Sequence, residues 1–282
     1  MKAFPITVLC RVMRASRSGF YDYLDRFTRH RGKIAPASAV KTRAQMIFKQ
    51  SRGSYGSRRI MHKLNAEGHR VGRYQVRSLM RQLGLKARVP RRYKLTTDSR
   101  HRFPVAQNVV NRNFTVDTPN AVWAADISYV WTWEGWLYLS VVMDLHSRQI
   151  VGWAMDKRMQ KDLVLDALSM AYFRRRPAPG LIHHSDRGSQ YACYEYQKRL
   201  EQYGMLASMS RKGDCWDNAP MERFFRSLKS ERLSALRFLT RQSARLEILD
   251  YIGFYNADRL HSSIGYLSPM DYEKEQLSKL AA

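Results

Sequence analysis

The chain has 282 residues, with 49 lysines and arginines against 24 aspartates and glutamates, so its formal net charge at pH 7 is +25. Hydrophobic residues make up 44% and aromatic residues 12%, which supports a packed core and excludes a chain disordered throughout. The large excess of positive charge disfavours a small-molecule enzyme. It indicates a polyanionic partner, which is nucleic acid or an anionic membrane surface. No apolar run approaches the roughly 18 residues of a spanning helix, which excludes a transmembrane protein.

The three cysteines, Cys10, Cys193 and Cys215, are odd in number and far apart. They favour neither a disulfide framework nor a zinc site, and reduced thiols in a cytoplasmic protein are the plain interpretation. The apolar N-terminal stretch is short, contains Pro5 and runs into Arg11 without a small-residue cleavage site, so we exclude a signal peptide.

The amino-acid composition of the chain changes near residue 120. Residues before it are rich in Arg and Lys, whereas all six tryptophans lie from Trp123 onward. This shift predicts a basic binding region followed by a packed domain. In the basic region, a small helical unit is expected at 7–24 and a linker at 25–43. The expected domains are a basic helical segment at 1–43, a helix-turn-helix at 44–88, a basic linker at 89–119 and an α/β domain with a C-terminal helix at 120–275.

Residues 54–85 have the pattern of a helix-turn-helix. Ser57 is expected to cap a first helix that Gly68 ends. A second helix starts near Arg73 and stops at Gly84. Such a motif places its second helix in the major groove, where arginines read base edges or hold phosphates; the alternative is a helical hairpin with a solvated basic face. The candidate DNA contacts are Arg58, Arg59, Arg73, Arg77 and Arg81.

From residue 121 the pattern indicates strands. Strands are expected at 121–131, 136–143, 149–155, 181–185 and 206–209, and helices at 161–175, 191–204 and 217–233. The first three strands form an antiparallel meander, and the full order predicts a mixed sheet with helices on its faces. Trp131, Trp133 and Trp136 are expected to pack the first hairpin, although an exposed one could stack on a base.

Three carboxylates occupy distinctive places in this pattern. Asp126 lies inside the first strand, where burying a charge is costly without a partner. Asp186 follows a short buried strand, where open α/β sheets place ligands, and Glu222 lies early in a helix. Each alone is more often a surface charge or a cap; together they could hold two magnesium ions that activate a hydroxyl for attack on a phosphodiester. Asp214 and Asp217 compete with Glu222 as third ligand, and Asp217 is better explained as a helix cap.

Neighbouring residues have two interpretations each. Arg226 and Lys229 share a helix face with Glu222 and could hold the scissile strand by its phosphates, or form a solvated face. Arg187 is expected to pair with acidic groups or contact phosphate. For His183 and His184, packing or hydrogen bonding is favoured over metal binding.

The flanks of the carboxylates, together with other segments, carry a family resemblance. The segments are Trp123–Tyr129, His184–Tyr191, Asp217–Glu222, Tyr55–Ile60 and Tyr255–Pro269, and 35 residues lie between Asp186 and Glu222. They resemble the B-frame product of the insertion-sequence three family of transposases, whose DDE core is similar to retroviral integrases. The likeness covers nearly the whole chain. Ala125 is a departure, since a hydroxyl residue often precedes the aspartate.

The resemblance implies a ribonuclease-H-like mixed five-stranded sheet flanked by helices, forming an integrase-type catalytic core over 120–275. It implies that Asp126, Asp186 and Glu222 hold two Mg²⁺ or Mn²⁺ ions. Water would free a 3′ hydroxyl at the element's end, and this hydroxyl would attack a second phosphodiester directly. Such in-line transfer needs positioning and charge neutralisation more than a protein nucleophile.

The same resemblance implies several partners and a location. The partners are double-stranded DNA, both element ends and target, further copies of the chain on DNA, and an upstream A-frame product. The implied location is the bacterial cytoplasm, at the nucleoid.

Two other functions stay open at this point. A non-enzymatic helix-turn-helix regulator would use the basic motif alone, but the Asp/Asp/Glu set argues against it. Another ribonuclease-H-like nuclease, cutting hybrids or junctions, is disfavoured by the 35-residue spacing and the appended helix-turn-helix. Strand joining, rather than cutting alone, separates this nuclease from a transposase.

Overall fold

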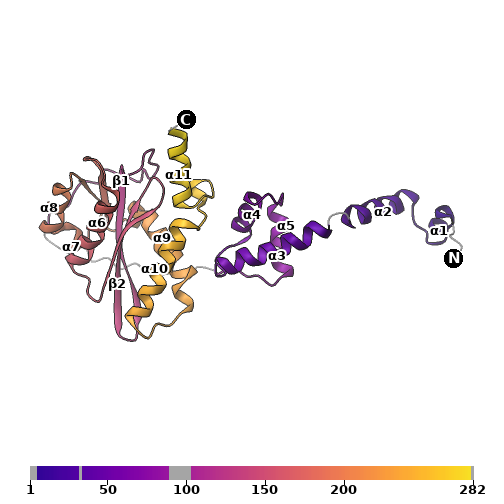
Figure 1. Cartoon of the computed structure of the whole chain (residues 1–282), viewed down its shortest axis with the longest axis horizontal. Helices are drawn as coiled ribbons and strands as arrows, with labels where there is room; N and C mark the ends of the chain where they lie inside the picture. Colours follow the sequence, from indigo (N-terminus) through magenta and orange to yellow (C-terminus); the bar gives the residue numbers. More distant parts are fainter. Residues whose placement is uncertain (1–4, 32–33, 89–102, 281–282) are drawn as a thin grey trace. The chain divides into compact units, whose positions relative to one another are not determined.

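The computed structural model describes residues 5–31, 34–88 and 103–280. The chain divides into two compact units, an N-terminal unit of residues Met1–Ala87 and a C-terminal unit of residues Arg88–Ala282 (Figure 1). Within the described residues, no helix combines the length and the apolar character needed to cross a membrane.

The N-terminal unit is helical along its described length. Its helices are α1 (Ile6–Val12), α2 (Arg17–Arg31), α3 (Ile34–Gln50), α4 (Ser57–Ala66) and α5 (Arg73–Gln82). The expectation of a linker at 25–43 is therefore wrong, because α2 and α3 occupy most of it. The sequence of α3 is rich in Ala, Gln, Met and Lys, which favour helix, and this composition outweighed the lack of an apolar period.

A small apolar core joins α3, α4 and α5. It consists of the buried side chains Ala44, Ile47, Ile60, Leu64, Val76 and Met80. Gly68 (φ +86°) follows α4 and Gly84 (φ +65°) follows α5, so glycine supplies the left-handed backbone at both helix ends. Ser57 is not the cap of α4; Gly56 takes that position and Ser57 is the first helical residue. The expected pair of short helices is confirmed.

The C-terminal unit is built on a mixed five-stranded sheet, as the sequence predicts. Its strands are β1 (Val122–Thr132), β2 (Gly135–Asp144), β3 (Ile150–Asp156), β4 (Ile182–Ser185) and β5 (Leu206–Met209), in the order β3-β2-β1-β4-β5. The first three strands pair antiparallel through short turns. The pairs β1–β4 and β4–β5 are parallel, which requires a crossover connection before each later strand.

Helices cover both faces of this sheet (Figure 1). They are α6 (Lys161–Arg175), α7 (Ser189–Ala192), α8 (Tyr194–Gln202), α9 (Ala219–Glu231), α10 (Arg241–Ala257) and α11 (Pro269–Leu280), with short 3₁₀ turns η1 (Cys215–Asn218), η2 (Leu233–Ala235) and η3 (Ser262–Ile264). Residues of α6, α7 and α8 pack on one face and residues of α9 and α10 on the other, giving two apolar clusters. The single helix expected at 191–204 is interrupted at Cys193, whose backbone is extended (φ −66°, ψ 150°).

The segment before β1 packs against this unit. The sequence predicts a basic linker over 89–119, of which residues 89–102 lie outside the described part. In the remainder, Phe103 contacts the apolar cluster under α6–α8, and Phe114 and Val116 contact the cluster under α9 and α10. This stretch therefore contributes to both cores of the C-terminal unit.

Candidate active site

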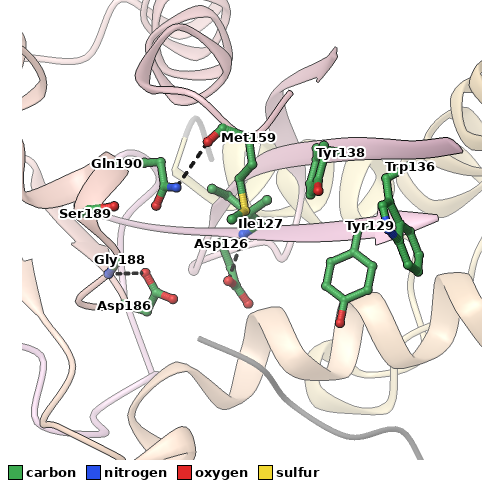
Figure 2. Close-up of a pocket in the computed structure, with 10 residues that line it drawn as sticks. All are labelled: Asp126, Ile127, Tyr129, Trp136, Tyr138, Met159, Asp186, Gly188, Ser189 and Gln190. Atoms are coloured by element: carbon green, nitrogen blue, oxygen red, sulfur yellow. Dashed lines mark hydrogen bonds between the residues drawn. The ribbon is translucent and has the colours of Figure 1, made fainter. Parts of the chain in front are cut away.

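A cavity of about 490 Å³ contains two of the three candidate carboxylates. It is formed by β1, β2, the loops after β3 and β4, and the start of α7, and Figure 2 shows the side chains around it. The lining residues are Asp126, Ile127, Tyr129, Trp136, Tyr138, Met159, Asp186, Gly188, Ser189 and Gln190. Carboxylates and aromatic rings thus share one cavity.

Asp126 projects from the middle of the central strand β1. Its Oδ1 accepts a hydrogen bond from the backbone N–H of Ile127 at 2.7 Å. Burial raises the pKa of Asp126 well above its usual range, and the negative charges of Asp186 and Glu222 raise it further. Three acids from separate elements therefore act on one another at this position.

Asp186 lies immediately after β4, in a tight loop. Its Oδ1 accepts a hydrogen bond from the N–H of Gly188 at 2.9 Å. A side chain at Gly188 would place its first carbon 3.0 Å from this oxygen and 3.1 Å from Gln190 Oε1, so the loop has room for glycine alone without adjustment. This turn begins α7 and fixes the carboxylate at the end of β4.

Glu222 lies in the first turn of α9. The buried Asn218 sits at the start of this helix and donates a hydrogen bond from Nδ2 to the carbonyl oxygen of Ala125, at 3.1 Å. Because Ala125 precedes Asp126, this bond ties the start of α9 to β1 beside the first carboxylate. Apolar residues of α9, including Phe224 and Leu228, are buried against the sheet.

His183 and His184 are buried in β4 and serve packing and hydrogen bonding. His184 Nδ1 lies 2.9 Å from Ser208 Oγ, and its Nε2 lies 3.0 Å from the carbonyl oxygen of Asp217. Burial lowers the pKa of His183 to about 3 and that of His184 to about 4, so both rings are neutral at pH 7. The second bond of His184 joins β4 to the segment that leads into α9.

Asp217 is not a helix cap, which corrects the expectation from sequence. It is fully buried; its Oδ1 accepts from Arg211 Nη2 and from Arg112 Nε, both at 2.8 Å. Hydrogen bonding to Arg211 holds the pKa of Asp217 well below its usual range. Asp214 instead caps the 3₁₀ turn by accepting from the N–H of Trp216. Both competing acids therefore hold loops, and neither is among the residues that line the cavity.

The basic residues expected near the carboxylates differ in their placement. Lys229 is half-buried on α9, with Nζ 5.2 Å from the centre of the Tyr129 ring, and the charge of Asp126 acts on it. Arg226 is exposed on the same helix. Arg187 is half-buried, and its Nε donates to the carbonyl oxygen of Ser210 at 2.5 Å.

The candidate DNA contacts of the N-terminal unit lie mainly on α5. Arg73, Arg77 and Arg81 follow at four-residue intervals and are all exposed, so they share one face. A hollow of about 410 Å³ is lined there by Tyr74, Arg77, Ser78 and Arg81. On α4, Arg58 is exposed, whereas the guanidinium of Arg59 lies 5.4 Å from the centre of the Tyr55 ring.

The carboxylates fit a divalent cation by their chemistry. Within residues 5–31, 34–88 and 103–280, no three Asp, Glu, His or Cys side chains lie close enough together to hold a metal ion. However, Asp126 and Asp186 line one cavity, and the repulsion that raises the pKa of Asp126 is what a bound cation would relieve. Coordination by all three acids therefore requires a closer approach than this structure has.

Sequence reasoning missed part of the cavity wall. Tyr129 and Tyr138 line it because they are paired across β1 and β2, a register that the sequence does not state. Met159 lines it from a loop and Gln190 from the short helix α7, and neither position carries a periodic signal. The bond of Asn218 to the carbonyl oxygen of Ala125 also depends on tertiary structure, which the sequence does not show.

Comparison with protein families identifies three segments. Residues 37–93 match an HTH-like domain. Residues 116–215 and residues 222–277 match two integrase core domain models. The two core segments contain Asp126, Asp186 and Glu222.

Solved structures of viral integrases are similar over parts of the chain. One is a simian T-cell lymphotropic virus intasome, with 13% identity, a TM-score of 0.49, and coverage of 81% of this chain and 73% of the other. Another is the catalytic core domain of BIV integrase, with 17% identity, a TM-score of 0.43, and coverage of 57% and 99%.

Curated relatives are similar over nearly the whole chain. A 31 kDa protein of insertion element IS600 from Shigella sonnei is 43% identical over 275 residues, which cover 97% of this chain and all of the relative. The transposase InsF of insertion sequence IS3A from Escherichia coli K12 is 39% identical over 276 residues, covering 98% and 96%. With its HTH-like and integrase core domains, the chain belongs to the IS3 family of insertion-sequence transposases.

Proposed function

We propose that Asp126, Asp186 and Glu222 are the catalytic carboxylates of this DNA transposase and that they hold two Mg²⁺ or Mn²⁺ ions. The observation that carries the proposal is that the negative charges of Asp186 and Glu222 both raise the pKa of Asp126, whose side chain lines one cavity with that of Asp186. When bound, the ions activate the attacking oxygen and stabilise the leaving oxygen of a phosphodiester.

The chain's own residues prepare this site. Asp126 is fixed by the central strand, Asp186 by its tight loop, and Glu222 by the bond between Asn218 and β1. Because its pKa is raised, Asp126 retains a proton at a higher pH than an ordinary aspartate until a cation is bound. Preorganised carboxylates of this kind position reacting groups at low entropic cost.

The proposed reaction has two phosphoryl transfers. In the first, a water oxygen attacks the phosphorus at the element's end, the P–O3′ bond breaks, and a 3′ hydroxyl is released. In the second, that hydroxyl attacks another phosphodiester, forming a new P–O3′ bond as the original 3′ oxygen of that strand leaves. No covalent intermediate with the protein is needed, and catalysis depends on positioning and charge neutralisation.

The basic residues supply the DNA contacts in this proposal. Arg226 and Lys229 on α9, with Arg187 after β4, hold the scissile strand by its phosphates. The arginines of the helix-turn-helix, Arg58, Arg59, Arg73, Arg77 and Arg81, hold element ends, with α5 as the helix that enters the major groove.

Partners and location follow from this chemistry. Joining DNA requires two ends and a target at once, so we infer further copies of the chain on the DNA. An A-frame product is the second proposed partner. Because its substrate is DNA and its relatives are bacterial, we expect the protein to act at the nucleoid.

A strand-cleavage and strand-joining assay on the terminal DNA of the element tests the proposal. Wild-type chain should give joined products that depend on Mg²⁺ or Mn²⁺, and D126N, D186N and E222Q should lose them while still binding DNA. E201Q is the matched control, since Glu201 is an exposed acid of α8 outside the cavity. Joined products from E222Q, or from wild type without a divalent cation, would contradict the proposal; cleavage without joining would favour a nuclease.

A further inference from the structure

Four aromatic side chains form a continuous row along the β1–β2 hairpin. Their ring centres are 6.3 Å apart for Tyr138 and Tyr129, 5.0 Å for Tyr129 and Trp136, and 4.8 Å for Trp136 and Trp131. The rings share one face because Tyr129 pairs with Tyr138 and Trp131 pairs with Trp136 in the register of the two strands. We refer to these four side chains as the aromatic row.

The aromatic row leads from the carboxylate cavity to solvent. Tyr129, Tyr138 and Trp136 line the same cavity as Asp126 and Asp186 (Figure 2). Trp136 is 41% exposed, and Trp131, which does not line the cavity, is 57% exposed. The three contacts between neighbouring rings are edge-to-face. In this arrangement the edge of one ring meets the face of the next, and the two rings do not stack face to face. The row is thus an apolar surface that starts at the site of chemistry.

The hairpin that carries the row is braced at its turn. Thr132 Oγ1 donates to the carbonyl oxygen of Gly135 at 2.7 Å, and the N–H of Trp133 donates to the carbonyl oxygen of Phe238 at 3.0 Å. From α10, Nε of Arg241 donates to the carbonyl oxygen of Trp136 at 3.0 Å. These bonds hold the backbone of the hairpin at its turn, from Phe238 and from α10, and so fix the strands that carry the rings.

A positive charge lies beside this surface. The Nζ of Lys229 is 5.2 Å from the centre of the Tyr129 ring, on the helix that carries Glu222. Cations that hold phosphates, alternating with aromatic rings that hold bases, are the combination that binds unpaired nucleic acid strands. In a DNA strand, one deoxyribose joins each phosphate to the nearest base. A phosphodiester bound at the carboxylates would therefore have a base close to the wall of the cavity.

We propose that the aromatic row stacks on an unpaired nucleobase of the DNA strand that enters the cavity, next to the reacting phosphodiester. The inference rests on the proposed function, because the carboxylates define where that phosphodiester lies. A nucleobase is favoured over a second protein chain because the row begins inside the cavity rather than on a separate patch. Stacking of this kind tolerates any base and positions the strand after the terminal base pairs open.

Binding of two single-stranded probes by the full chain, without divalent metal, tests the inference. The probes are a 12-nucleotide oligothymidylate and an abasic strand of the same length, which has the same phosphates but no bases. W136L keeps an apolar side chain without a ring, and should lower affinity for oligothymidylate about 5- to 100-fold while changing affinity for the abasic strand less than about twofold. W136F keeps a ring and should retain most of the base-dependent affinity.

W133L is the matched control, because Trp133 is 74% exposed on the same hairpin but belongs to neither the row nor the cavity lining. It should leave both affinities unchanged. The inference is overturned if W136L binds oligothymidylate as wild type does, if W136L weakens both probes equally, or if W133L has the same effect. Sedimentation velocity adds a further arm: a change of oligomeric state in W136L but not in W133L would assign the row to contacts between copies.

These outcomes are separate from the fate of the proposed function. Probe binding needs neither metal nor chemistry, so a wild-type chain that fails to cleave or join DNA contradicts the catalytic proposal without altering the affinities. Conversely, the wild-type chain could join DNA normally while W136L shows no base-dependent loss of affinity. That result would leave the catalytic proposal intact and contradict the stacking proposal.

Discussion

Arginines chosen from the two units of this transposase lie in contrasting surroundings. In the C-terminal unit, Arg175 pairs with Asp144 and Glu273, and the buried Arg259 pairs with Glu231 at 2.6 Å. In the N-terminal unit, Arg73, Arg77 and Arg81 are exposed along one face of α5. The strong positive charge therefore combines two contributions: arginines that pair with acids inside the fold and arginines that are exposed on its surface. Composition reports only their sum.

The largest effect is expected from breaking a buried pair. Arg259 donates to both oxygens of Glu231, at 2.6 and 2.8 Å, and Glu231 Oε2 also accepts from Tyr251 Oη. R259A leaves the buried carboxylate without its cation and should lower the free energy of unfolding of the C-terminal unit by about 3–5 kcal/mol. Denaturant unfolding measures this. R226A, at an exposed position of α9, should change it by less than about 0.5 kcal/mol, and an equal loss in both would contradict the distinction.

The next effect is a loss of stability as the pH is lowered. His183 and His184 have pKa values of about 3 and 4 in the folded chain, below the ordinary value of 6.5. Between pH 6.5 and 4 the unfolded chain binds more protons, so stability is full above pH 6.5 and falls as the pH falls, by about 1.4 kcal/mol for each pKa unit of difference. Thermal unfolding from pH 7 to 4 should show this slope. H184Q, which accepts hydrogen bonds but does not titrate, should reduce this slope in part, because His183 still titrates; an unchanged slope in H184Q would show that other groups cause it.

Replacing an exposed arginine of α5 should lower DNA affinity without lowering stability, the reverse of the effect expected at Arg259. R77A removes a side chain that lines the hollow on this helix and should lower affinity for the element's terminal DNA by about 1–3 kcal/mol, with an unchanged unfolding midpoint. Binding measured over a series of salt concentrations distinguishes its two roles: loss of a phosphate contact reduces the log–log slope by about 0.9, and loss of a base contact changes discrimination between sequences. A destabilised R77A with intact affinity would place this arginine among the structural ones.

The smallest effect is a gain in stability at the proposed site. Burial and neighbouring charges raise the pKa of Asp126, so the folded chain holds a proton there that the unfolded chain has released, and stability falls as the pH rises above the ordinary aspartate range. Without divalent metal, D126N should raise the free energy of unfolding at pH 7 by about 0.5–2 kcal/mol, and this gain should vanish near pH 3. A destabilised D126N at pH 7 would show that the carboxylate is favourably held.

Local patterns predicted the elements well where one physical cause dominated. Alternation marked β1 and β2, and helical periodicity with terminal glycines marked α4 and α5. The positions of Asp126, Asp186 and Glu222 in strand, loop and helix were also readable, because a charge inside a β-rich run is unusual in itself. What the sequence could not show is how close these acids lie, since that depends on strand order and on the bond from Asn218 to β1.

The failures involve partners distant in sequence. Asp217 reads as a cap because it precedes a helix, but its carboxylate is held by Arg112, which lies 105 positions away. The tryptophans of the hairpin were expected to pack it; Trp131 and Trp136 do contact each other, yet both are exposed, and Trp133 more so. Local composition does not encode this exposure, because it depends on which elements cover the hairpin.

We propose that three acids from three elements form one divalent-metal site. Titration with Mn²⁺, followed by electron paramagnetic resonance of the unbound ion, tests this directly without requiring DNA or an assembled complex. The account predicts two bound ions per wild-type chain, a loss of bound ion in D126N, D186N and E222Q alike, and no loss in E201Q. Unchanged Mn²⁺ binding in E222Q, or in either aspartate variant, would contradict it.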